Sequence, residues 1–217
     1  MATDDTIIFL HSPNTRSSGV RLLLAELGAP HELRPVNMKA GEQRQPAFLA
    51  INPMGKVPAI LHRGALVTEQ VAIYIYLADL FPEAGLTPAL DDSLRGPYLR
   101  WLAFYGACFE PAFVDRAVKR DAAPPRMSPY GDFDTMLKTL TDQLAHGPYV
   151  VGARKTAADV LWGTALAWTT AFKIVPELPV IMDYVQRMAE HPEVDRIKAL
   201  DARLEAEHEA AVKATAP

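Results

Sequence analysis

The sequence predicts a small α/β domain followed by an all-helical domain. In the first third of the chain, short runs rich in apolar and β-branched residues alternate with segments of helical periodicity. The composition changes at Phe81, and residues 82–92 are rich in proline, glycine and aspartate, as is typical of a linker. Beyond this stretch the apolar spacing is helical throughout. We therefore divide the chain into an α/β domain at 1–81, a linker at 82–92 and an all-helical domain at 93–217.

The first domain is expected to have the element order βαβαββα. Residues 6–11 form an apolar run that ends at Ser12 and Pro13, which predicts a buried strand leaving into a loop. A helix should follow, because residues 17–28 carry apolar side chains at helical spacing and end in a glycine. This order favours a small mixed sheet with helices on its faces. The remaining expected elements are a strand at 31–36, a short helix at 45–51, strands at 57–62 and 65–67, and a largely buried helix at 69–80.

The second domain should consist of helices alone. Asp91 or Asp92 can cap a long helix that continues to about Arg120, after which Pro124 and Pro125 break the pattern. A capping-box pattern, with Thr156 three residues before Asp159, marks the start of a later helix. The further helices are expected at 132–146, 156–173, 179–190 and 193–212.

Composition and charge restrict the function. The formal net charge is -4 and charged residues make up 22% of the chain, so no basic surface for nucleic acid is expected. The chain has no basic leader and no apolar run of about eighteen residues, so we expect no membrane partner. Cys108 is the only cysteine, which fits a reducing compartment, and we expect a cytoplasmic protein. The six histidines lack paired ligand spacing, so no metal site is predicted.

The segment around Val57 and Pro58 has the properties of a peptide-binding edge. A proline at the start of a strand is favourable where its peptide bond is cis and turns the chain. Such a bond would leave the N–H and C=O groups of Val57 unpaired, so that an extended peptide could pair with them. Glu69 and Gln70 come at the start of a helix, where free N–H groups attract a carboxylate and the Glu69 side chain can bind an ammonium group.

These features occur together in a known family. Residues 52–60 (NPMGKVPAI), 67–73 (VTEQVAI) and 76–79 (YLAD) resemble the N-terminal, thioredoxin-like domain of the cytosolic glutathione transferases, most closely the bacterial beta class. The resemblance implies glutathione as co-substrate, a small hydrophobic electrophile as second substrate, and a homodimer. It also implies that Lys56 and Lys39 meet the glycyl carboxylate of glutathione. Gln70 departs from the family pattern, in which serine is usual.

A glutathione transferase must stabilise a thiolate, since the thiolate is the nucleophile. Lowering a thiol pKa by about two units requires about 2.7 kcal/mol, which one or two hydrogen bonds can supply. The beta-class cysteine aligns with Arg16, and serines of two other classes align with Thr15 and Asn14. We predict Thr15 as the first candidate donor, then Asn14, Ser12 and Ser17, with Arg16 as an electrostatic contributor. The alternative is that some of these polar residues only cap the following helix.

The helical half carries an aromatic stripe that includes Tyr105, Phe109 and Phe113. These side chains would line an apolar pocket for the electrophile, or belong to the core or a dimer interface, which is the more common role of such a stripe. Glu110 stands where beta-class relatives carry a histidine. The sequence thus predicts conjugation, reduction or isomerisation of an electrophile by glutathione. The alternative is a non-catalytic module of the same fold that binds ligands or proteins.

Overall fold

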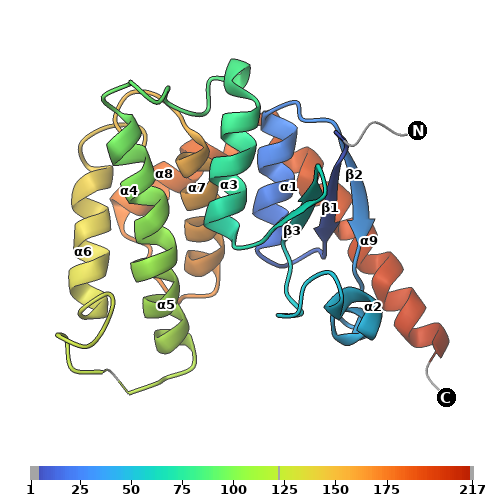
Figure 1. The fold of residues 1–217 in the computed structure, drawn as a ribbon. Helices are drawn as coiled ribbons and strands as arrows, with labels where there is room; N and C mark the ends of the chain where they lie inside the picture. Colours follow the sequence, from blue (N-terminus) through green and yellow to red (C-terminus); the bar gives the residue numbers. More distant parts are fainter. Residues whose placement is uncertain (1–4, 122, 216–217) are drawn as a thin grey trace. The chain divides into compact units, whose positions relative to one another are not determined.

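The alternation of strand and helix in the first third of the sequence produces a four-stranded sheet of order β2-β1-β3-β4 (Figure 1). Strand β1 (Ile7–His11) pairs in parallel with β2 (His31–Pro35) and antiparallel with β3 (Ala59–His62). Strand β4 (Ala65–Val67) forms a hairpin with β3. The central strands supply the core, where Phe9 is fully buried.

The helices of this part of the chain have the expected order. Helix α1 (Ser17–Glu26) buries its apolar stripe, which explains why the helical spacing of that segment was informative. A single 3₁₀ turn, η1 (Glu42–Arg44), and the short helix α2 (Pro46–Leu49) follow β2, and α3 (Gln70–Leu80) follows β4. The predicted order βαβαββα is therefore confirmed.

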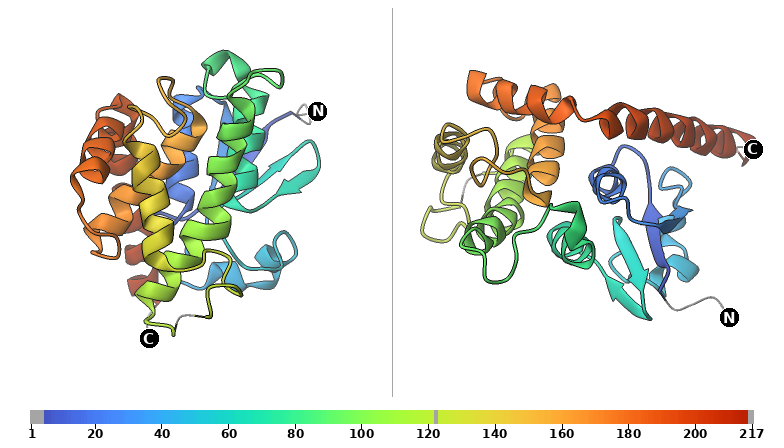
Figure 2. Two further views of the ribbon diagram at one scale, coloured as in Figure 1. Left: turned by 90° about the vertical axis from the view of Figure 1, so that its left-hand side faces the viewer. Right: turned by 90° about the horizontal axis from the view of Figure 1, so that it is seen from above.

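The computed structural model describes residues 5–121 and 123–215, which fall into two compact units. The first unit comprises the residues up to Leu77 together with those from Pro192 onward, and the second comprises Ala78–His191. The last helix, α9 (Pro192–Thr215), thus belongs to the first unit and lies alongside α1 (Figure 2). This division differs from the expected one, which assigned the whole C-terminal part to the helical domain.

The second unit is built from helices. After a 3₁₀ turn, η2 (Pro82–Ala84), it contains α4 (Arg95–Phe104), a π-helical turn η3 (Tyr105–Phe109) and α5 (Glu110–Ala117). Its described part contains one isolated β-bridge, Tyr149 to Gly152, and no strand. The remaining helices are α6 (Phe133–Leu144), α7 (Ala157–Ala171) and α8 (Pro179–Ala189).

The expectation of one long helix from Asp91 or Asp92 to about Arg120 is wrong in detail. The helix begins at Arg95, and its regular hydrogen bonding is interrupted by η3 before α5 begins. Pro111 lies in the first turn of α5, and a proline has no N–H and clashes with the carbonyl of the preceding turn. The π-helical turn η3 lies directly before this helix, and such turns occur mostly as single-turn interruptions of α-helices.

The predicted capping box at the start of α7 is confirmed. The Asp159 carboxylate accepts hydrogen bonds from the backbone N–H groups of Thr156 (2.8 Å) and Val150 (2.7 Å) and from the Tyr184 hydroxyl (2.9 Å). Asp159 is fully buried, which raises the pKa of its carboxyl group, and these bonds satisfy polar atoms that would otherwise be costly in the core. The Asp159 side chain therefore links α7 to α8 and to the loop that precedes α7.

Candidate functional site

The Val57–Pro58 peptide bond is cis, as the sequence predicts. Neither the N–H nor the C=O of Val57 takes part in a hydrogen bond within residues 5–121 and 123–215. The preceding loop is held from inside by the buried Asn52, whose Nδ2 donates to Lys56 O (2.9 Å) while its Oδ1 accepts from Met54 N–H (3.1 Å). The position of this edge thus depends on Asn52, a role that the sequence interpretation missed.

The start of α3 has the features of an anion site. Glu69 precedes the helix with φ 61°, and its carbonyl accepts the N–H of Ile73 (3.0 Å). The helical hydrogen bonding therefore begins at Glu69, and the start of a helix is where N–H groups lack the carbonyl of a preceding turn and the helix dipole attracts an anion. The Glu69 carboxylate is exposed and accepts a hydrogen bond from the Thr68 hydroxyl (2.8 Å).

Gln70 connects this helix start to the loop that follows β1. Its Nε2 donates to the backbone carbonyl of Arg16 (3.2 Å). The serine that is usual in the family is too short for an equivalent reach, so the departure at Gln70 has a structural consequence. The candidate thiol-activating loop and the candidate carboxylate site are joined by this bond.

The two lysines predicted to meet the glycyl carboxylate differ in their surroundings. Lys56 is exposed at the edge beside Val57, and within the described part of the chain it forms no ion pair. Lys39 pairs with Glu205 and with Glu209 (2.7 Å), both on α9, and these carboxylates raise the pKa of Lys39. The charge of Lys39 is therefore already balanced by two carboxylates of the same unit.

The loop between β1 and α1 brings the predicted donors together at different depths. Asn14 is exposed with φ 55°, a left-handed conformation that asparagine tolerates. Arg16 is also exposed, and Thr15 is half-buried. Ser12 and Ser17 are buried beneath the loop, with 4% and 0% of their surface exposed.

A hydrogen-bonded cluster fixes this loop. Thr15 Oγ1 donates to Ser12 O (2.7 Å), accepts from Ser17 N–H (3.1 Å) and lies 2.7 Å from Ser17 Oγ. Ser17 Oγ accepts the N–H of Ser12 (3.1 Å) and lies 2.8 Å from Nδ1 of His11. The polar residues thus bond mainly to one another: the N-cap residue of α1, Arg16, makes no side-chain cap, and Thr15 Oγ1 accepts the first N–H of the helix, that of Ser17.

His11 is fully buried at the end of β1, and its Nε2 lies 3.1 Å from Asp201 Oδ1 on α9. Burial lowers the pKa of His11, and Asp201 opposes this shift only in part. The pKa of Asp201 is itself lowered, because hydrogen bonds from His11, Ser18 and Arg21 outweigh the effect of its burial. His11 and Asp201 were not identified from the sequence, because 190 positions separate them.

The aromatic stripe belongs to the core of the second unit. Tyr105, Phe109 and Phe113 have 3%, 0% and 3% of their surface exposed. Both Tyr105 and Phe109 pack against the ring of Trp162, with centroids 5.4 and 4.9 Å apart. The Tyr105 hydroxyl donates to Glu110 Oε1 (2.6 Å). These contacts place the three rings in the core of the second unit, and their predicted role in an electrophile pocket stays a prediction.

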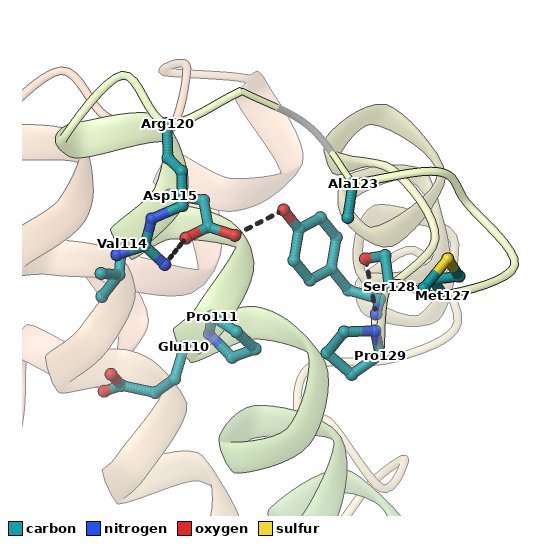
Figure 3. Close-up of a pocket in the computed structure, with 10 residues that line it drawn as sticks. Glu110, Pro111, Val114, Asp115, Arg120, Ala123, Met127, Ser128 and Pro129 are labelled. Atoms are coloured by element: carbon teal, nitrogen blue, oxygen red, sulfur yellow. Dashed lines mark hydrogen bonds and ion pairs between the residues drawn. The ribbon is translucent and has the colours of Figure 1, made fainter.

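A separate cavity of about 400 Å³ lies around the loop between α5 and α6 (Figure 3). Its wall includes Asp115, which accepts hydrogen bonds from Arg120 Nη1 (2.6 Å) and the Tyr130 hydroxyl (2.9 Å). None of the three predicted aromatic residues lines it. Cys108 is half-buried nearby, donating to Pro129 O (3.6 Å), and burial raises the pKa of its thiol.

The described residues contain neither a group of side chains that could bind a metal ion nor a helix that could cross a membrane. There, histidine, cysteine and acidic residues form no group of three or more that could hold a metal ion. No helix among the described residues is long and apolar enough to cross a membrane.

Comparison with known proteins identifies the family of this chain. The family model of the glutathione S-transferase N-terminal domain matches residues 5–79. The glutathione S-transferase GstA of Escherichia coli O157:H7 is 32% identical over 189 residues, which are 85% of this chain and 93% of that protein.

Similar solved structures match the fold over nearly the whole chain. A glutathione transferase from Methylococcus capsulatus has a TM-score of 0.76 and 29% identity, covering 91% of this chain and 99% of its own. A sphingomonad glutathione S-transferase, solved in complex with glutathione, has a TM-score of 0.75 and 28% identity, covering 90% and 98%. This chain therefore belongs to the glutathione S-transferase family.

Proposed function

We propose that this glutathione transferase binds glutathione along the free edge at Val57 and at the N-terminus of α3. The N–H and C=O of Val57 have no hydrogen-bond partner among residues 5–121 and 123–215, and they carry the proposal, because they offer an extended peptide the two bonds of an added strand beside the buried Pro58. The cysteinyl residue of glutathione would pair there. Its γ-glutamyl carboxylate would meet the first N–H groups of α3, and its ammonium group would meet Glu69.

At the other end of the tripeptide, we assign the glycyl carboxylate to Lys56. Lys56 is exposed beside Val57 and forms no ion pair within the described residues, so its charge is available. Lys39 is bound by two carboxylates of α9, and moving it would leave Glu205 and Glu209 as close like charges. We therefore leave Lys39 out of the site.

For the thiol we retain Thr15 as the first candidate donor and Asn14 as the second. Both side chains reach the surface of the loop, whereas those of Ser12 and Ser17 lie beneath it. A hydroxyl or amide hydrogen directed at the sulfur would favour the thiolate over the thiol. Arg16 would add a favourable field. The activated thiolate would attack a small hydrophobic electrophile, in a cytoplasmic enzyme that acts as a homodimer.

Calorimetric titration with glutathione tests the binding part of this proposal. The native protein should bind glutathione, and Glu69→Gln should weaken binding about tenfold because it removes the partner of the ammonium group. Glu83→Gln, which changes an exposed acid in η2, serves as the matched control and should leave the affinity unchanged. Equal affinities for the two variants would contradict the role of Glu69.

Turnover separates the enzyme from a binding module. A chlorinated nitrobenzene and an organic peroxide are suitable first substrates, because one reports conjugation and the other reduction. Glutathione-dependent conversion of either supports the proposed enzyme. Binding without turnover across a wider panel would favour the non-catalytic module instead, and absence of binding would contradict both.

A further inference from the structure

A buried polar chain runs from α9 to the surface of the loop after β1, and the proposed glutathione site uses only its last member, Thr15. It begins at Asp201, passes through His11 and Ser17, and ends at the half-buried Thr15. The successive separations are 3.1 Å (Asp201 Oδ1 to His11 Nε2), 2.8 Å (His11 Nδ1 to Ser17 Oγ) and 2.7 Å (Ser17 Oγ to Thr15 Oγ1). Each separation is within the range of a hydrogen bond.

The partners of Asp201 decide where the hydrogens of this chain lie. Its carboxylate accepts hydrogen bonds from Arg21 Nη1 and Ser18 Oγ, each at 2.5 Å, and is ionised at neutral pH, since its pKa is lowered. An ionised carboxylate only accepts, so His11 Nε2 must carry a hydrogen. In the neutral ring Nδ1 is then an acceptor, and it receives the hydroxyl hydrogen of Ser17.

The Ser12 carbonyl provides a second acceptor for the two hydroxyl groups. It lies 2.7 Å from Thr15 Oγ1 and 2.8 Å from Ser17 Oγ, and either hydroxyl can donate to it. While Ser17 donates to His11, Thr15 can donate either to this carbonyl or to Ser17 Oγ, and the relay uses the second arrangement. The outer lone pair of Thr15 Oγ1 is then available as an acceptor at the loop surface.

We propose that this chain is a proton relay for the glutathione thiol, with His11 as the group that takes the proton. The proposal rests on the proposed function, in which the thiol lies at Thr15. The thiol S–H bond breaks and its proton passes to Thr15 Oγ1. The former hydroxyl hydrogen of Thr15 passes to Ser17 Oγ, and that of Ser17 passes to His11 Nδ1. A thiolate and an imidazolium result, and the total charge is unchanged.

Every hydrogen has a partner after the transfer. Thr15 now donates to the thiolate, Ser17 donates to the Ser12 carbonyl, and both ring nitrogens of His11 donate, to Ser17 and to Asp201. Because the carbonyl can accept from either hydroxyl, the relay can change direction without leaving a buried polar group unsatisfied. If the hydroxyl groups of Thr15 and Ser17 only capped α1, a single arrangement of their hydrogens would be enough.

The charged groups around His11 set the balance between its two states. Asp201 favours the imidazolium, whereas Arg21 on α1 and His208 on α9 oppose it. The thiolate adds a further negative charge once it forms. Before glutathione binds, burial lowers the pKa of His11 and so favours the neutral ring, and the charge of the thiolate then favours the imidazolium.

The members of the relay have different roles. Thr15 is the only one that would touch the sulfur. Ser17 is fully buried and does not reach a ligand, so we describe Ser17, His11 and Asp201 as positioning residues that act through Thr15.

Proton release on binding tests the relay in the native protein. Calorimetry in buffers of different ionisation enthalpy counts the protons released when glutathione binds near neutral pH, and ultraviolet absorbance counts the thiolate formed. The relay predicts clearly fewer than one proton released per thiolate, because the proton stays on His11. Release of one full proton per thiolate, with normal binding, would overturn the relay and leave the proposed function intact. No binding of glutathione at all would overturn both.

Two matched pairs of variants test whether Asp201 and Thr15 belong to the relay. Asp201→Asn should raise the pH midpoint of thiolate formation by about one unit, a tenfold loss of thiolate below that midpoint, with glutathione affinity changed less than about twofold. Asp195→Asn, an exposed change of the same kind on α9, should leave the midpoint in place. Equal midpoints for the two variants would contradict the relay.

The second pair avoids α9 and its contacts with Arg21 and Ser18. Thr15→Val removes the terminal hydroxyl and should raise the midpoint by a similar amount. Thr15→Ser restores the hydroxyl and should return the midpoint to that of the native protein. If Thr15→Val gave the native midpoint, Thr15 would not be the end of the relay and the proposal would fail.

Discussion

At the scale of single residues, the loop from Asn52 to Val57 depends on a glycine for its shape. Gly55 has φ +62°, and a Cβ atom there would come within 2.8 Å of the Gln43 carbonyl oxygen and 2.9 Å of Arg44 Nη1. A side chain is therefore disfavoured by both its backbone conformation and its neighbours. The loop positions the Val57 edge, so strain at Gly55 should affect the binding of glutathione as well as stability.

We predict that Gly55→Ala lowers the free energy of unfolding by about 1–3 kcal/mol and weakens glutathione binding. Gly96→Ala is the matched control, since Gly96 lies in α4 without a positive φ, and a Cβ atom there would meet no atom within 4 Å. That change should be neutral or slightly stabilising. Denaturant unfolding and calorimetry measure both effects, and equal stabilities would show that Gly55 is not constrained.

Sequence alone could propose the residues whose roles depend on local motifs. Val57, Glu69 and Gln70 fall within the family-like segments at 52–60 and 67–73, and their roles in binding glutathione stay predictions. His11 and Asp201 are paired only because α9 lies against α1, and no local pattern indicates which distant carboxylate a buried histidine will meet. The hydroxyl cluster was predicted as a set of alternatives, and only tertiary packing distinguishes the buried Ser17 from the half-buried Thr15.

At the scale of secondary-structure elements, the contact between β1 and α9 makes stability depend on pH. Burial lowers the pKa of His11 below the ordinary histidine value of 6.5, so below that pH the unfolded chain binds a proton that the folded chain does not. The free energy of unfolding therefore falls as the pH drops from about 6.5. Asp201 has a lowered pKa, and its contribution is lost only at pH values below its ordinary 3.8.

We predict that His11→Gln flattens the loss of stability between about pH 6 and pH 5, where one proton contributes at most about 1.4 kcal/mol per pH unit. His146→Gln, at an exposed histidine beyond α6, is the control and should keep the native slope. Thermal unfolding at several pH values gives the comparison. A native slope in His11→Gln would mean that His11 does not carry this dependence.

Element boundaries were predicted where local chemistry fixes them and missed where packing does. The capping box of Thr156 and Asp159 marked the start of α7 correctly, because both partners lie within one turn. The break at η3 was missed, because the apolar spacing continues through it and only the proline at position 111 signals an interruption.

At the scale of the whole molecule, the end of the chain completes the first compact unit. Besides the Asp201 contacts, Asn37 Nδ2 donates to the His208 carbonyl (3.0 Å), and Lys39 pairs with two acids of α9. The composition change at Phe81 indicated one boundary, but nothing in an amphipathic helical sequence says which unit its apolar face will cover. The fold class was therefore predictable, whereas the membership of α9 was not.

The central claim is that the cysteinyl backbone of glutathione pairs with Val57, and hydrogen exchange at the Val57 amide tests it most directly. Within the described residues this N–H has no hydrogen-bond partner, so it should exchange rapidly in the free protein. Saturating glutathione should slow its exchange at least about tenfold, since the bound peptide would occupy it in nearly every molecule. If glutathione bound with the exchange of Val57 unchanged, the proposed binding mode would be contradicted.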